Sequence, residues 1–140
     1  MIVSEAMTED PFFVNVEQTV GDAVAALIKS HVRHLPVLEA GVVVGIISDH
    51  DFQSSGVPTE LQQLLADAPR LQALLNQPVS KLMTREAITL TPDRDLSDAI
   101  DLIVQHRIGA IPIVDPESNK LVGIVSYVDA LRALRSAAWG

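Results

Sequence analysis

Cysteine is absent from the 140-residue sequence, and this absence excludes disulfide bonds and thiolate metal sites. Aromatic residues make up only 4% of the chain, so Val, Ile, Leu and Ala must fill the core of a sequence that is 48% apolar. Long apolar runs are missing too, since the longest covers residues 42–47 and contains Gly45. A run of that length is too short for a bilayer, which takes about 20 residues. The composition therefore predicts a folded protein with an aliphatic core and no membrane span.

Basic residues are also few, because 10 Lys and Arg stand against 18 Asp and Glu and give a formal net charge of −8. An acidic surface repels nucleic acid and anionic lipid, so we expect neither nucleic acid nor a membrane as a partner. A small anion held in a local basic pocket is still allowed. The N-terminal segment carries Glu5, Glu9 and Asp10 and lacks a basic stretch before an apolar one, which favours a cytoplasmic protein.

The sequence repeats itself. The pattern VSxxMT at residues 3–8 recurs at residues 79–84, an offset of 79 − 3 = 76 residues, and LPV at residues 35–37 recurs with the same offset as IPI at residues 111–113. The pattern VGIISxxD at residues 44–51 returns as VGIVSxxD at residues 122–129. The offset of this last pattern is 122 − 44 = 78, two residues more than before. The two additional residues fall in the turn at residues 115–120, where insertions are least disruptive. A colinear series of this kind indicates an internal duplication.

Both copies predict the order β-α-β-β-α. Residues 12–16 and 88–90 are short strand candidates, and capping boxes that begin at Thr19 and Asp95 open the first helices. Two strands rich in β-branched residues follow in each copy, at 35–38 and 42–47 and at 111–114 and 121–125, and a second helix begins at Ser48 or Ser126. The expected fold is α/β (α+β), with two βαββα units packed about a pseudo-two-fold axis.

The expected boundaries are a first repeat at 1–55, a helical linker at 56–78 and a second repeat at 79–140. Residues 54–58 read as a loop, and residues 59–76 as one or two helices interrupted at Pro69. This segment either packs on its own module or offers a contact surface for a second subunit. Its apolar stripe consists of Leu61, Leu64, Leu65, Leu71, Leu74 and Leu75.

The duplicated VSxxMT, LPV and GhhSxxD patterns (h apolar) resemble a pair of cystathionine-β-synthase-type (CBS) domains, also called a Bateman module. The resemblance covers residues 2–134. The chain resembles those members of the family that consist of the CBS pair alone. It implies two equivalent clefts between the repeats that bind AMP, ADP, ATP or another adenosyl compound, and association into a homodimer. It also implies a regulatory role toward a second protein that the sequence does not name. No cofactor is required.

The motifs Ser48-x-x-Asp51 and Ser126-x-x-Asp129 allow two interpretations. In one, each Ser caps a helix and the Asp three residues later accepts a backbone N–H. In the other, each carboxylate accepts hydrogen bonds from ribose hydroxyls, with the Ser beside the ribose or phosphate. We expect ribose contact, because the motif occurs twice, each time directly after a strand that contains glycine.

The resemblance places the adenine held by one copy against the opening strand of the other. Asp51 would pair with residues 85–89, and Asp129 with residues 10–13. Plain core packing is the alternative for at least one of the two phenylalanines, because side chains alternate along a strand. The candidate adenine-binding residues are Asp10, Pro11, Phe12, Phe13, Ala87 and Ile88.

Arg33 and His34 stand where nucleotide-binding members often carry basic residues, so they are candidates for phosphate binding. Gly109 and Ala110 replace them in the second copy, where Arg107 is the nearest candidate, so we expect the two clefts to differ in charge. Arg33 as a solvated surface charge is the alternative.

Metal binding and catalysis are not expected. His31 and His34 stand three residues apart, but no cysteine or clustered carboxylate supports a metal site, and His50 and His106 add none. The sequence also lacks a nucleophile elbow and a phosphate-cradling glycine loop. We therefore expect an adenine-nucleotide sensor and not an enzyme. The rival hypothesis is a ligand-free structural or protein-interaction module.

Overall fold

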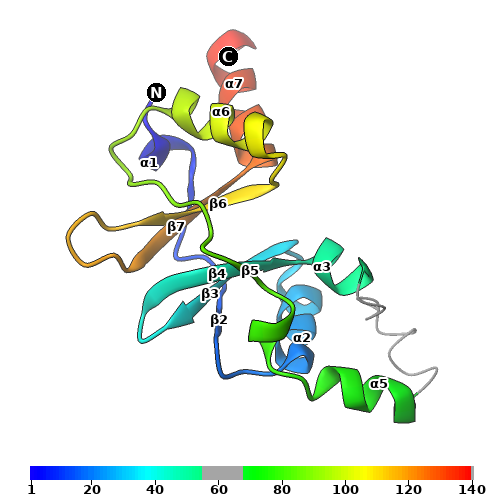
Figure 1. Cartoon of the computed structure of the whole chain (residues 1–140). Helices are drawn as coiled ribbons and strands as arrows, with labels where there is room; N and C mark the ends of the chain where they lie inside the picture. Colours follow the sequence, from blue (N-terminus) through cyan, green and yellow to red (C-terminus); the bar gives the residue numbers. More distant parts are fainter. Residues whose placement is uncertain (55–67, 140) are drawn as a thin grey trace. The chain divides into compact units, whose positions relative to one another are not determined.

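The computed structural model describes residues 1–54 and 68–139, and the chain divides into two compact units (Figure 1). The first unit consists of Met1–Pro11, Gly41–Val43 and Ala87–Gly140. The second consists of Phe12–Ala40 and Val44–Glu86. Each unit therefore combines most of one repeat with the opening segment of the other.

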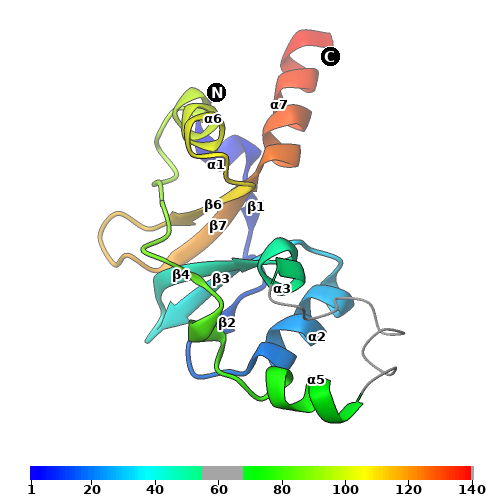
Figure 2. The same cartoon turned by 45° about the vertical axis from the view of Figure 1, so that its right-hand side comes forward.

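The first unit has a three-stranded sheet in the order β1-β7-β6, antiparallel at both pairings. Helices α1, α6 and α7 contact one another and the strands of this sheet (Figures 1 and 2). Val3, Ile111 and Val125 are fully buried between them. The elements are α1 (Val3–Ala6), β1 (Thr8–Glu9), α6 (Leu96–His106), β6 (Ala110–Val114), β7 (Leu121–Ser126) and α7 (Tyr127–Trp139).

The second unit has a four-stranded sheet in the order β2-β3-β4-β5. Helix α2 packs against β3, and α3 and α5 pack against α2 (Figure 2). Leu35, Ile47 and Phe52 are fully buried in its core. The elements are β2 (Val14–Asn15), α2 (Val20–Ser30), β3 (His34–Glu39), β4 (Val42–Ser48), α3 (Asp49–Ser54), α5 (Ala68–Leu75), the 3-10 helix η1 (Val79–Lys81) and β5 (Thr84–Arg85).

The opening segments of the two repeats are exchanged. Val3 is fully buried in the core of the second repeat, and its N–H donates to the carbonyl of Arg94 at 2.8 Å. Val79 is likewise buried in the core of the first repeat, and its N–H donates to the carbonyl of Gln18 at 2.9 Å. Strands β1 and β5 follow these two valines and pair antiparallel with β7 and β4. The same local pattern thus makes the same contacts twice, each time with the other copy.

The exchanged strands require glycine beneath them. A Cβ at Gly45 would lie 2.7 Å from the carbonyl oxygen of Thr84 on β5, and a Cβ at Gly123 would lie 3.1 Å from that of Thr8 on β1. The side chains of Met83 and Met7 lie over the same glycines. The glycine and methionine of each repeat motif are therefore contact partners across the exchange.

The predicted α+β fold with two βαββα units is confirmed. Between β3 and β4 the chain turns at Ala40 and Gly41, which both have positive φ. The opening strands are shorter than predicted. Residues 12–16 contain only β2, and residues 88–90 contribute a single bridge from Leu90 to Ile113. Short stretches of this kind gain regular pairing only where a neighbouring strand lies alongside them.

The predicted capping boxes differ between the copies. Thr19 accepts the N–H of Asp22 at 3.2 Å, and the Asp22 carboxylate accepts the N–H of Thr19 at 3.1 Å, so the first box is confirmed. Asp95 is the N-cap of α6 but makes no side-chain cap hydrogen bond, so the second box is wrong. Its carboxylate instead accepts the Ser97 hydroxyl at 3.0 Å and lies 3.8 Å from the ammonium of Met1.

The predicted linker helix is present at residues 68–75 as α5, and it contains Pro69. Leu74 and Leu75 pack against the core of the second unit, which agrees with packing on the chain's own module. The remaining part of that prediction, residues 55–67 with Leu61, Leu64 and Leu65, lies outside the described residues. Within the described residues, no helix is both long and apolar enough to cross a membrane.

Candidate functional site

The Ser48-x-x-Asp51 motif forms a reciprocal capping box where β4 ends and α3 begins. The Ser48 N–H donates to Oδ2 of Asp51 at 2.8 Å, and the Asp51 N–H donates to Oγ of Ser48 at 3.3 Å. The Ser48 hydroxyl also donates to the same carboxylate oxygen at 3.1 Å. The capping interpretation is therefore confirmed, and it fixes the Asp51 side chain at the start of the helix.

The second motif repeats this geometry at the start of α7. The Ser126 N–H and hydroxyl donate to Oδ2 of Asp129 at 2.9 and 3.0 Å, and the Asp129 N–H donates to Oγ of Ser126 at 3.1 Å. The other carboxylate oxygen, Oδ1, accepts the Thr8 hydroxyl at 3.4 Å. A carboxylate oxygen accepts more than one hydrogen bond, so capping and ligand binding are compatible here.

Sequence reasoning missed that Thr8 lies beside the second motif. It lies on β1, 121 positions before Asp129 in the sequence, and the exchange of opening segments brings it beside the second motif. The signal was present, since the Met-Thr of VSxxMT is duplicated, but the pattern does not say which copy receives the strand.

The chain turns out of each sheet directly after the exchanged strand. Asp10 and Glu86, which are equivalent in the repeat, have φ of 47° and 53°, a left-handed conformation that is uncommon for residues other than glycine. Their N–H groups donate to the carbonyls of Val122 and Val44 at 3.4 and 3.3 Å. The two candidate adenine-binding stretches continue directly from these turns, as Pro11–Phe13 after Asp10 and Ala87–Ile88 after Glu86.

Phe12 and Phe13 lie outside the core, with exposed fractions of 60% and 47%. Core packing of one of them is therefore wrong, because both precede β2 and neither alternates within a strand. Ala87 and Ile88 are half-buried. Contact between these residues and an adenine stays a prediction.

Arg33 and His34 stand beside the first motif. The Asp49 N–H donates to the carbonyl of Arg33 at 3.0 Å, which joins the start of β3 to the start of α3. Burial lowers the pKa of the His34 imidazole, and the nearby carboxylates of Asp49 and Asp51 oppose this shift. The positive charge of Arg33 lowers the pKa of His34 further. The structure thus gathers basic and acidic groups at this turn.

The second copy has the same backbone contact without these side chains. The Tyr127 N–H donates to the carbonyl of Gly109 at 2.9 Å, and Ala110 is buried at the start of β6. Arg107 is the C-cap of α6 with φ of 53°, and in the described part of the chain no hydrogen bond or ion pair joins it to the motif.

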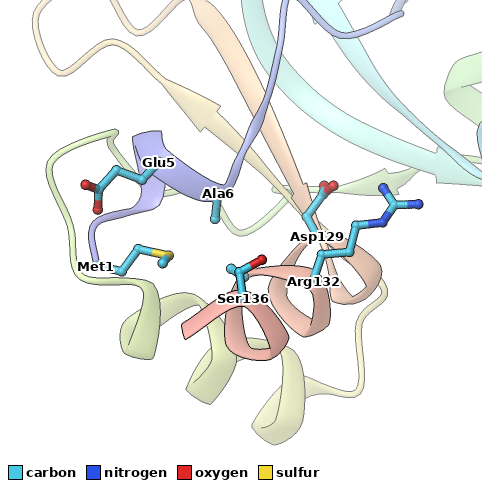
Figure 3. A pocket seen from close by; sticks show the side chains of 7 residues that line it. Met1, Glu5, Ala6, Asp129, Arg132 and Ser136 are labelled. Carbon is cyan, nitrogen blue, oxygen red and sulfur yellow. The ribbon is translucent and has the colours of Figure 1, made fainter. Parts of the chain in front are cut away.

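A pocket of about 250 Å³ opens beside Asp129, between α1 and α7 of the first unit (Figure 3). Arg132, one turn after Asp129 on α7, lines this pocket. The lining residues are Met1, Glu5, Ala6, Asp129, Arg132, Ala133 and Ser136. Among residues 1–54 and 68–139, no group of three or more His, Asp or Glu side chains is placed to hold a metal ion.

Known proteins share this architecture along nearly the whole chain. A CBS domain-containing protein of Bacillus subtilis, YhcV, is 36% identical over 128 residues, which cover 91% of this chain and 81% of the relative. Uncharacterized protein MJ0188 of Methanocaldococcus jannaschii is 29% identical over 133 residues, and there the match covers 94% of this chain but only 43% of the longer relative.

Solved structures agree. The crystal structure of CBSX2 in complex with AMP superimposes with a TM-score of 0.78 at 27% identity, covering 97% of both chains. The family model of the CBS domain matches residues 3–55 and 79–136, the two repeats identified above. With both copies matched and the fold shared, the chain belongs to the CBS domain family as a tandem pair.

Proposed function

We propose that this protein is a regulatory module that binds an adenine nucleotide through the carboxylates of Asp51 and Asp129. The observation that carries the proposal is the duplicated turn. In its second copy one oxygen of the Asp129 carboxylate caps the helix, and the other accepts a long hydrogen bond from the Thr8 hydroxyl at 3.4 Å. The presence of AMP on CBSX2, which is 27% identical, supports an adenine nucleotide as the ligand.

In this proposal the ribose hydroxyls donate to Asp51 or Asp129, with Ser48 and Ser126 holding the carboxylates in place. Adenine contacts the exposed residues that follow the exchanged strands. Arg33 and His34 contact phosphate at the first motif, because they already stand beside its carboxylates. The location of both ligands between the repeats, and a phosphate contact from Arg107, remain predictions from the family resemblance.

Regulation would follow from differential affinity. A ligand shifts an equilibrium between two conformations only by as much as it binds one of them better. AMP, ADP and ATP differ in charge at the phosphate end, so they would bias such an equilibrium to different extents. A protein that contacts the module in one conformation then reads the nucleotide.

Calorimetry with AMP, ADP and ATP tests the proposal, using Asp51→Asn and Asp129→Asn singly and together. Asn keeps an acceptor for the capping N–H but loses the charge-assisted bonds, each worth about 1.5–3 kcal/mol, so the double variant should bind at least about 10-fold more weakly. Asp22→Asn is the matched control, because Asp22 closes a capping box with Thr19 that belongs to neither motif. No binding by the native protein at millimolar nucleotide would refute the proposal.

A protein-interaction module is the second candidate, and one observation favours it. Leu131, Leu134 and Trp139 of α7 are exposed by 59%, 48% and 82%. Exposed apolar side chains clustered on one helix are typical of a contact surface. This surface agrees with the expectation of a homodimer, which sedimentation tests directly. A monomer at high protein concentration would contradict it.

A further inference from the structure

Each unit has an arginine near its Ser-x-x-Asp capping motif, but the arginine stands at a different position of the repeat in each unit. In the second unit Arg33 precedes β3 and its backbone contacts the first residue of α3. In the first unit the equivalent position is Gly109, which has no side chain. The later part of the repeat has an offset of 129 − 51 = 78, so Arg132 corresponds to Ser54, which carries no charge. Each unit thus has an arginine at a place where the other has none.

Arg132 is placed to act on the same ligand as Asp129. The two residues are three apart on α7 and so lie on one face of the helix. Their side chains extend toward the same side of the helix in Figure 3, and both line the pocket beside α1. The Arg132 side chain is exposed, and within the described residues no hydrogen bond or ion pair engages its guanidinium. Its positive charge is therefore accessible to a bound anion.

We propose that Arg132 binds the phosphate of a nucleotide whose ribose is held by Asp129, an inference that rests on the proposed function. A guanidinium presents donors in a planar fork that matches two phosphate oxygens, and such bonds are charge-assisted. Arg132, which lies on α7, would then contribute at the first unit the phosphate contact that we propose for Arg33, just before β3, at the second. The first unit is then a phosphate-binding site despite Gly109 and Ala110.

The charges of the pocket select a monophosphate. Arg132 is its one guanidinium, whereas Glu5 and Asp129 both contribute carboxylates. Glu5 points away from Arg132 in Figure 3, so its negative charge lies at the other end of the pocket. The ammonium of Met1, which also lines the pocket, already lies 3.8 Å from the Asp95 carboxylate. A second or third phosphate would therefore meet no further basic side chain of the lining and an additional carboxylate, that of Glu5. The ligand class is therefore a nucleoside 5′-monophosphate.

The test isolates the first unit by using the full chain with Asp51→Asn, which weakens the site of the second unit. Calorimetry then compares AMP, ATP and adenosine before and after Arg132→Met, with Arg135→Met as the control, because Arg135 is an exposed arginine of α7 that does not line the pocket. AMP should bind at least about 10-fold more weakly after Arg132→Met, while adenosine should change by less than about twofold. ATP should bind more weakly than AMP before the change.

Several results would overturn the inference: an unchanged AMP affinity, an equal loss for AMP and adenosine, an equal loss with Arg135→Met, or AMP binding that vanishes with Asp51→Asn alone. Tighter binding of ATP than AMP would overturn the monophosphate class. If the native protein binds no nucleotide, the proposed function itself fails, which is a different outcome from any of these. A thermal melt of each variant checks that the chain is folded, which is expected for the exposed positions Arg132 and Arg135.

Discussion

Replacing Gly45 and Gly123 with alanine should have unequal effects on stability, although the two glycines occupy the same place in the repeat. Alanine in a strand interior is favoured over glycine by roughly 0.5–1 kcal/mol, because glycine loses more backbone entropy on folding. Against this gain stands the strain of the added methyl group. Forcing an extra carbon into a packed site typically destabilises by about 1–3 kcal/mol.

The obstacles at the two positions differ in kind. At Gly45 the new Cβ meets the backbone oxygen of Thr84 at 2.7 Å, and a main-chain atom of a paired strand cannot move without shifting β5. At Gly123 the backbone oxygen of Thr8 is 3.1 Å away, and the closer atom is the sulfur of Met7 at 2.5 Å, near the end of a flexible side chain. Strain should therefore dominate at Gly45 and nearly cancel the entropic gain at Gly123.

We expect Gly45→Ala to lower the free energy of unfolding by about 1–2 kcal/mol and Gly123→Ala to change it by less than about 0.5 kcal/mol. Guanidinium denaturation of the two variants and the native protein measures both changes. Adding Met7→Ala to Gly123→Ala should relieve the strain that comes from the Met7 sulfur, whereas Met83→Ala should not rescue Gly45→Ala, because the Thr84 oxygen stays in place. Equal losses at the two glycines, or a larger one at Gly123, would refute this reasoning.

Two further predictions concern a helix cap and a histidine. Thr19→Ala should lower stability by about 1 kcal/mol, whereas Asp95→Ala should cost less because Asp95 makes no cap bond, and a larger loss for Asp95→Ala in thermal melts would contradict this. Because burial lowers the pKa of His34, the unfolded chain binds more protons below about pH 6.5, so stability should fall as the pH falls through that value. His34→Gln should reduce this loss between pH 7.5 and 5.5, and an unchanged pH profile would count against the role of His34.

Most of the fold could be predicted because the helices and strands of the repeat are specified by residues close together in the sequence. Strands rich in β-branched residues and the Thr19 capping box depend on neighbours in sequence, and these predictions are confirmed. The exchange of the opening segments could not be predicted in this way. Val3 and Val79 have the same local sequence, so nothing near them says which core they enter.

The candidate site shows the same division. The capping geometry of Asp51 and Asp129 follows from the spacing of Ser and Asp, and sequence reasoning found both residues. The positions of Thr8 and Arg132 beside Asp129 were missed, because they depend on the pairing of β1 with β7 and on the face of α7 that lines the pocket. At Asp95 the sequence predicted a cap that the structure does not contain. Asp is a favoured N-cap residue, but here its carboxylate accepts the Ser97 hydroxyl and no backbone N–H of the helix.

Strand β1 completes the sheet of the second repeat, and β5 completes the sheet of the first. Either repeat expressed alone would therefore lack one strand of its sheet. A fragment ending before Val79 would lack the buried valine of its own core, and the complementary fragment would lack Val3. An ancestor with one copy would have had to borrow this segment from a second molecule. In the present chain both opening segments belong to one polypeptide, so the exchange needs no second molecule.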